Sequence, residues 1–238
     1  MARSISEQTI FHLDPEHSGV RFAIISILLV TFVIAFVAMN YVLRIVAPEL
    51  NTPVILACLA AVPISLLFSA VGEWYLKRTW HSGRKLIVEP ETITLHLPEG
   101  ENKEIDRHKK MNQLWWQVPL AGYARGGRER RVPAKWSCVA GQLQQDETRV
   151  VAFCYARPGR LEEWRSQYEF VRLHPNDVYK TSFRARLGSP MRPEIPAEVI
   201  AGEQGRYWLA ERNRWGFGVE LTEDDFEQFL GLVRSNAQ

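Results

Sequence analysis

Two long apolar runs lie close together near the start of the chain, from about residue 20 to 43 and from about residue 53 to 76. Each is as long as the roughly 20 residues that a helix needs to cross the hydrocarbon layer of a bilayer. Each run holds one charged residue, Arg21 at the start of the first and Glu73 near the end of the second. We therefore predict two transmembrane helices joined as a hairpin.

A signal peptide and a buried core helix are the alternative interpretations of the first run. Its apolar stretch is too long for the hydrophobic part of a signal peptide, and no small-residue cleavage site follows it. Apolar runs of about 18 residues or more are also unusual inside soluble proteins. The short distance to the second run favours a membrane hairpin over both alternatives.

Charges and aromatic residues around the two runs predict how the hairpin is oriented. The connector 46–53 has no Lys or Arg, whereas several cations follow the second run directly. The positive-inside rule then places the following domain in the cytoplasm, and two spans bring the N-terminus to the same side. Arg44, at the far end of the first run, opposes this orientation. We expect a multi-pass protein of the inner or plasma membrane, anchored at the interface by Tyr41, Trp74, Tyr75, Lys77 and Arg78.

Small residues recur at every fourth position of the second run. This spacing lets helices approach closely. The contact is expected either within the hairpin or with another chain, and Pro63 is expected to kink the helix. Glu73 and Lys77 are four residues apart, which favours an ion pair on one helix face. The candidate packing residues are Ala57, Ala61, Ser65 and Ser69.

The rest of the chain, residues 77–238, is long enough for one domain with its own core. It carries 26 Lys and Arg against 22 Asp and Glu, a mild positive charge that suits an anionic membrane surface and gives no reason to expect nucleic acid. β-branched and alternating apolar residues predict mostly antiparallel strands, including a hairpin around Gln144–Glu147. The predicted strands are residues 84–89, 91–97, 114–118, 136–143, 149–155, 207–210 and 217–221.

An amphipathic helix is predicted at the end of the domain. Thr222 is a favourable N-cap, and Asp225 three residues later resembles a capping box. Apolar residues then recur at helical spacing on one face, as a helix packed on a core requires. They are Phe226, Phe229, Leu230 and Val233.

The segments RKLIVEPETITLHL and GFGVELTEDDFEQFLGLV open and close this strand-rich region. Their order resembles the pleckstrin-homology-like (PH-like) fold in its bacterial membrane-anchored form, over about residues 84–155 and 205–235. The resemblance implies an α+β domain in which a small barrel or sandwich is closed by the C-terminal helix. The proline-rich stretch 156–204 departs from the pattern and is predicted to be an insertion. The expected organisation is thus an N-terminal segment 1–19, a hairpin 20–76 and a PH-like domain 77–238.

A basic cluster near the middle of the domain is the main candidate binding site. Its cations could hold anionic lipid headgroups, each contributing about 1 kcal/mol near an anionic leaflet, or they could form a solvated loop. Trp115 and Trp116 must point to opposite faces of a strand, so one is expected inside and the other exposed or covered. The cluster comprises Arg125, Arg128, Arg130, Arg131 and, further on, Lys135.

No sequence motif indicates a cofactor, a metal site or catalysis. The six histidines show no ligand spacing, and no phosphate-binding glycine motif occurs. Cys138 and Cys154 are expected to face each other or the core, and Cys58 lies in the second run. We expect a non-enzymatic, membrane-tethered accessory or scaffolding subunit that binds a membrane protein or a second copy of itself. The alternatives are a sensor of anionic lipid or envelope state and, less favoured, an enzyme acting on lipid or wall precursors.

Overall fold

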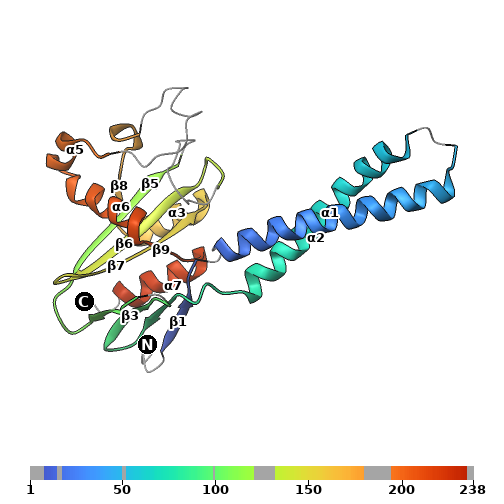
Figure 1. Cartoon of the computed structure of the whole chain (residues 1–238). Coiled ribbons are helices and arrows are strands. Elements are labelled where there is room, and N and C mark those ends of the chain that lie inside the picture. The colour runs from blue at the N-terminus through green and yellow to red at the C-terminus, as the bar shows by residue number, and fades with distance from the viewer. Residues whose placement is uncertain are drawn as a thin grey trace. The chain divides into compact units, whose positions relative to one another are not determined.

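The computed structural model describes most of the chain as two compact units. The first is the hairpin, Pro15–Ser82, and the second combines Met1–Asp14 with Gly83–Gln238; we call the second unit the α/β domain (Figure 1). Residues 8–14, which fall in the predicted N-terminal segment 1–19, belong to the same unit as the residues that follow the hairpin. The described residues are 8–14, 18–49, 52–98, 100–120, 132–179 and 194–234.

The hairpin consists of two antiparallel helices, α1 (Ser18–Val46) and α2 (Pro53–Thr79), which run side by side (Figure 1). Both are long and apolar enough to span a membrane. Only 6% of the most apolar window of α1 and 22% of that of α2 is buried, so neither helix resembles the core helix of a soluble protein. The two predicted helices are confirmed, each a few residues longer than expected.

One face of α2 is buried against α1. Ala57, Ala61, Ser65 and Ser69 are the buried residues of this helix, which agrees with the contact predicted from their spacing. A little further along, Gly72 allows a close approach, because a Cβ there would lie 3.0 Å from Ile27 Cδ1.

The first sheet of the α/β domain has four antiparallel strands in the order β1-β2-β3-β4. Its first strand precedes the hairpin in the chain and pairs with β2, which follows the hairpin. The apolar side chains of Phe11 and Leu13 favour the pairing of β1 with β2, because both point into the core and are almost fully buried. The strands are β1 (Thr9–His12), β2 (Lys85–Val88), β3 (Thr92–His96) and β4 (Lys103–Asp106).

The second sheet has five strands in the order β8-β5-β6-β7-β9, and its three central strands are antiparallel. The short outer strands β8 and β9 run parallel to their neighbours. The β-hairpin predicted around Gln144–Glu147 is confirmed, because β6 and β7 pair around a turn in which Asp146 has φ 51°. The strands are β5 (Asn112–Pro119), β6 (Ser137–Gln145), β7 (Thr148–Ala156), β8 (Val171–Arg172) and β9 (Val219–Glu220).

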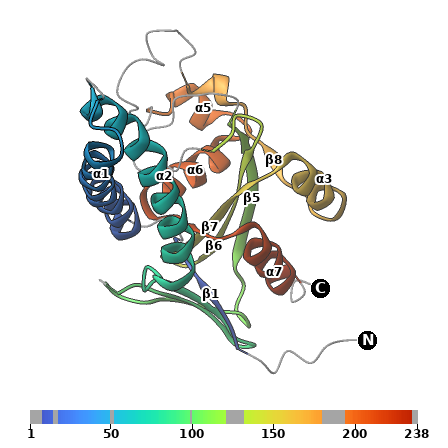
Figure 2. The ribbon, with the colours of Figure 1, turned by 90° about the vertical axis from the view of Figure 1, so that its right-hand side faces the viewer.

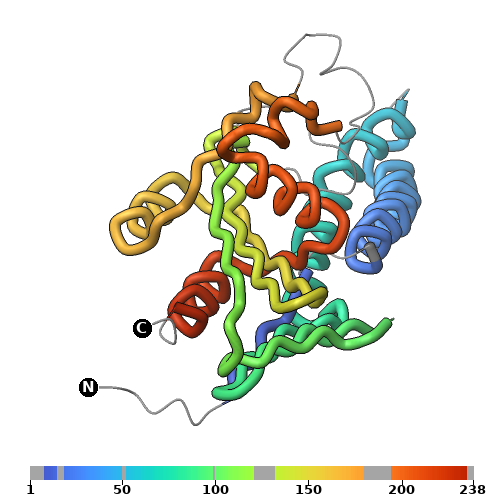
Figure 3. The backbone as a smooth tube through the Cα atoms, turned by 90° about the vertical axis from the view of Figure 1, so that its left-hand side faces the viewer, coloured from blue at the N-terminus to red at the C-terminus, as the bar shows by residue number. Residues whose placement is uncertain are grey.

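Helices cover both faces of the second sheet, with α6 on one face and α7 on the other (Figures 2 and 3). The predicted C-terminal helix is confirmed, since the Thr222 hydroxyl accepts a hydrogen bond from the backbone N–H of Asp225 at 3.2 Å. The helices are α3 (Pro158–Gln167), the 3-10 turn η1 (Pro175–Asp177), α5 (Ala197–Ala201), α6 (Gly205–Phe217) and α7 (Glu223–Arg234).

Two predictions about the domain are corrected. Residues 207–210, predicted as a strand, belong to α6, because Trp208 and Trp215 recur at helical spacing and are both buried. The stretch 156–204 is not simply an insertion, since Trp164 of α3 is fully buried in the core and β8 extends the second sheet. Within the described ranges the strands form two sheets and no closed barrel, and the resemblance to the PH-like fold stays a prediction.

The second sheet separates two apolar cores. Trp115 points into the core shared with the first sheet and α7, whereas Trp116 points into the core under α6. Their predicted divergence is confirmed, and both are buried. Cys138 and Cys154 also lie in different cores, on opposite faces of β6 and β7, so they cannot form a disulfide with each other.

Candidate functional site: the apolar hairpin and the Glu211 cluster

Most of the large apolar side chains that are exposed in the described part of the chain lie on the outer surface of the hairpin. Large side chains such as Leu29, Ile34 and Leu67 are more than half exposed. Burying a side chain of this size contributes about 1.5–3 kcal/mol, so leaving many of them in water is unfavourable. Soluble monomers rarely expose contiguous apolar surface on this scale, which marks the hairpin as a membrane- or protein-contacting element.

The predicted interface residues lie towards the ends of this apolar surface. Tyr41 near the end of α1 and Trp74 and Tyr75 near the end of α2 are exposed. The Arg78 guanidinium lies 5.8 Å from the centre of the Trp74 ring. Lys77 Nζ is 2.6 Å from Glu73 Oε1, which confirms the predicted ion pair on α2. Such amphipathic rings and cations are typical of the headgroup region of a bilayer.

A buried ion pair lies on the inner face of α6, in the core between this helix and the second sheet. Glu211 and Arg214 are only 1% and 4% exposed, and the guanidinium donates two hydrogen bonds of 2.8 and 2.7 Å to the carboxylate. Trp116 of β5 and Trp215 of α6 each donate an indole N–H to the same carboxylate at 2.8 Å. Charge-assisted bonds of this kind are among the strongest in proteins.

Four donors surround the Glu211 carboxylate, two on each oxygen. Charged groups are buried stably only when they are paired and hydrogen-bonded. Because all four donors come from fixed side chains of β5 and α6, we regard this cluster as a structural centre. It connects α6 to β5 across the core, and the Arg214 guanidinium also lies 4.8 Å from the centre of the Phe153 ring.

A small cavity adjoins the Glu211 cluster. Its empty volume is about 240 Å³, and its walls are mainly apolar, with Glu211 and Arg214 as the charged residues. No group of potential metal ligands lies within the described part of the chain. The lining residues are Val118, Pro119, Leu120, Cys138, Pro175, Tyr179, Glu211 and Arg214.

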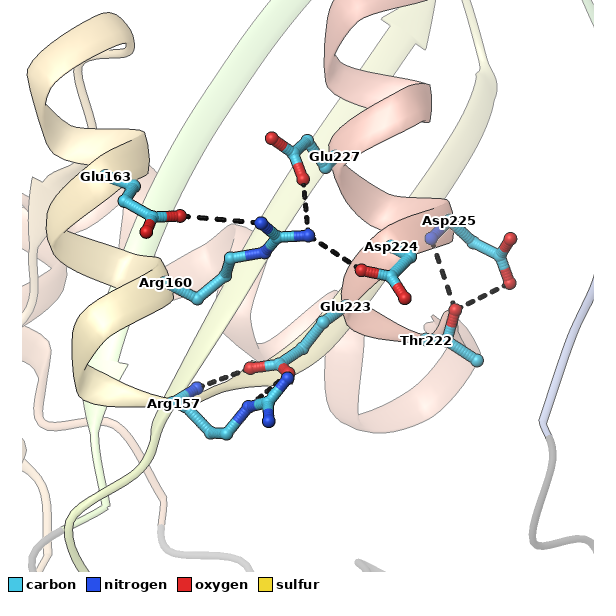
Figure 4. Close-up of polar contacts among 8 residues, drawn as sticks. All are labelled: Arg157, Arg160, Glu163, Thr222, Glu223, Asp224, Asp225 and Glu227. Carbon is cyan, nitrogen blue, oxygen red and sulfur yellow. Dashed lines mark hydrogen bonds and ion pairs between the residues drawn. The ribbon is translucent and has the colours of Figure 1, made fainter.

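An ion-pair network links α3 to the start of α7 (Figure 4). Arg160 contacts Asp224 at 2.7 Å and Glu227 at 2.9 Å, and Arg157 binds Glu223 through its backbone N–H and its side chain. The hydrogen bonds that the two guanidinium groups donate to Glu223 and Asp224 raise the pKa of both Arg157 and Arg160. Exposed ion pairs contribute little individually, so the network positions α3 against α7 rather than forming a reactive site.

A polar junction lies where the chain leaves the domain for the hairpin and returns from it. The Asp14 N–H donates to the Glu220 carbonyl at 2.9 Å, and its carboxylate accepts from the Glu220 N–H at 3.0 Å. The other Asp14 oxygen is 3.1 Å from Arg84 Nη1. Asp14 therefore connects the end of β1, the start of β2 and β9. Sequence reasoning missed this junction, because its partners are 70 and 206 residues away.

The predicted lipid-binding cluster is only partly described. Lys135 is exposed beside β6, while Arg125, Arg128, Arg130 and Arg131 lie outside the described residues. The buried position of Glu211 was also not predicted, although the helical spacing of Trp208, Glu211 and Trp215 would have placed it on the apolar face of α6.

No protein-family model, no curated protein and no solved structure matches the chain, so the assignment of function depends on its own geometry.

Proposed function

We propose that this chain is a membrane-anchored interaction module without enzymatic activity. The hairpin inserts into the cytoplasmic membrane, and the α/β domain binds a protein partner at its inner surface as an accessory or scaffolding subunit. The observation that supports this proposal best is the exposed apolar surface of α1 and α2, in a chain whose other unit has two buried cores of its own.

The pairing of β1 with β2 supports an arrangement in which both ends of the hairpin lie on one side of the membrane. β1 comes before α1 and β2 comes after α2, and the two strands are hydrogen-bonded neighbours. A chain that crosses the bilayer twice can satisfy this pairing, whereas a single crossing would separate the strands. The cations that follow α2 favour the cytoplasmic side.

Membrane insertion is tested by alkaline carbonate extraction of the full chain. We expect the protein to stay in the membrane pellet. Ile34 and Leu67 are exposed near the middle of α1 and α2, and a charged residue there costs about 2.5–3.5 kcal/mol of insertion free energy. The double variant Ile34→Lys/Leu67→Lys should therefore be released, while the matched control Ile34→Ala/Leu67→Ala should not. Release of the unaltered chain would refute anchoring.

Partner binding is tested by crosslinking in intact membranes, followed by purification of the full chain in mild detergent. We expect one membrane protein to co-purify in a fixed ratio and to remain after a salt wash. Recovery of the chain alone from crosslinked membranes would contradict the assignment as an accessory subunit.

A further inference from the structure

The hairpin is inserted at one particular point of the first sheet. The register pairs His12 of β1 with Lys85 of β2. One step further along the ladder, the Leu13 N–H donates to the Arg84 carbonyl at 3.2 Å. The next residues in the same register are Asp14 and Gly83, which are also the last and first residues of the domain on either side of the hairpin.

Asp14 and Gly83 share an uncommon backbone conformation. Their φ angles are 53° and 81°, so both lie in the left-handed region. A two-residue β-hairpin with a type I′ turn requires positive φ at both central residues, and Asp-Gly is one of its preferred sequences. Joined directly, the chain would read Leu13-Asp14-Gly83-Arg84, with Leu13 and Arg84 as the pair that flanks the turn.

We propose that residues 15–82 are an insertion at the tip of a two-residue Asp-Gly β-hairpin, and that the α/β domain is complete without them. This inference goes beyond the proposed function, because it concerns how the domain folds rather than what it binds. It also explains why a residue other than glycine adopts a left-handed conformation at position 14. Asp tolerates that conformation, and its carboxylate accepts hydrogen bonds from the Glu220 backbone N–H and the Arg84 guanidinium.

The cores of the domain support this proposal. Phe11 and Leu13 pack into the core between the two sheets together with residues of β2, β3 and α7. Within the described part of the chain, neither apolar core contains a residue of α1 or α2. Removing the hairpin therefore removes no side chain of either core of the domain, whereas removing β1 as well would expose the edge of β2 and empty the positions of Phe11 and Leu13.

The test compares the full chain in detergent with an excised chain in which Asp14 is joined directly to Gly83. We expect the excised chain to be monodisperse in water and to unfold cooperatively. Hydrogen exchange of the peptides in β2, β3 and β5–β7 should match that of the full chain. Aggregation, or a non-cooperative melt while the full chain in detergent unfolds cooperatively, would overturn the proposal.

Two controls make the test specific. In the excised chain, Gly83→Val places a β-branched residue at φ 81°, with its Cβ 3.1 Å from Pro98 Cγ, and should lower the melting temperature by several degrees. Equal stability would refute the Asp-Gly turn. A chain that starts at Gly83 lacks β1 and should lose cooperative unfolding; equal stability here would refute the requirement for β1.

The same excised chain separates this inference from the proposed function. If it folds in water and leaves the membrane fraction, both the insertion and the anchoring role of the hairpin are supported. If it folds but remains bound to membranes after an alkaline wash, the insertion stands, and the assignment of anchoring to the hairpin fails.

Discussion

Replacing Glu211 by alanine should be among the most destabilising single changes in the α/β domain. The substitution leaves the Arg214 guanidinium buried without its carboxylate, and removing one partner of a buried ion pair typically costs about 3–5 kcal/mol. The indole N–H groups of Trp116 and Trp215 lose their acceptor at the same time. An unsatisfied buried donor costs about 1–3 kcal/mol, but these penalties overlap because the site relaxes as a unit. We therefore expect a total loss of about 4 kcal/mol in the free energy of unfolding.

Urea denaturation followed by tryptophan fluorescence measures this loss. For a slope of about 2–3 kcal/mol per molar urea, the midpoint should fall by roughly 1–2 M. The double variant Glu211→Leu/Arg214→Met removes both charges and keeps apolar volume, so it should be more stable than Glu211→Ala alone. A midpoint shift below about 0.3 M for Glu211→Ala, or a double variant less stable than the single one, would refute the reasoning.

Four further outcomes are expected. Gly141→Ala would place a Cβ 2.1 Å from Cζ3 of Trp115 and should lower stability by about 3 kcal/mol in the same urea titration. Thr222→Ala removes the N-cap of α7 and should cost about 1 kcal/mol by that measurement. Ala61→Leu overfills the contact between α1 and α2 and should speed proteolysis of the hairpin in detergent. The hydrogen bond from the backbone N–H of His108 lowers the pKa of Asp106 below its usual 3.8. The ionised carboxylate of Asp106 therefore stabilises the folded state at neutral pH, and this stabilisation is lost as the pH falls through that lowered pKa. Asp106→Asn should therefore reduce the difference between urea midpoints at pH 7 and pH 3.

The elements that could be predicted from sequence are those whose signal is local. The two spans follow from length and composition, and α7 follows from its cap and its apolar spacing. The alternating residues of β3 and the turn between β6 and β7 are local signals too. Each of these features is encoded within about 25 residues or fewer, so no knowledge of distant contacts is needed.

The missed features depend on contacts between distant parts of the chain. The four residues of β1 carry too little pattern to be recognised, and their partner strand lies beyond the whole hairpin. The segment at 207–210 consists of four apolar residues, which suits a strand or a buried helix equally until its neighbours are known. Burial of Glu211 requires an indole donor from Trp116, 95 residues earlier. These features arise only once the tertiary structure forms.

The burial of both faces of the second sheet has a consequence for strand alignment. Neighbouring residues along β6 point alternately into the two cores, as Cys138 and Val139 do. A slip of one residue against β5 or β7 would move every side chain of the strand into the opposite core, where its volume does not fit. Insertions of one residue into β6 should therefore be much less tolerated than insertions of two, because only an even shift preserves which core each side chain enters.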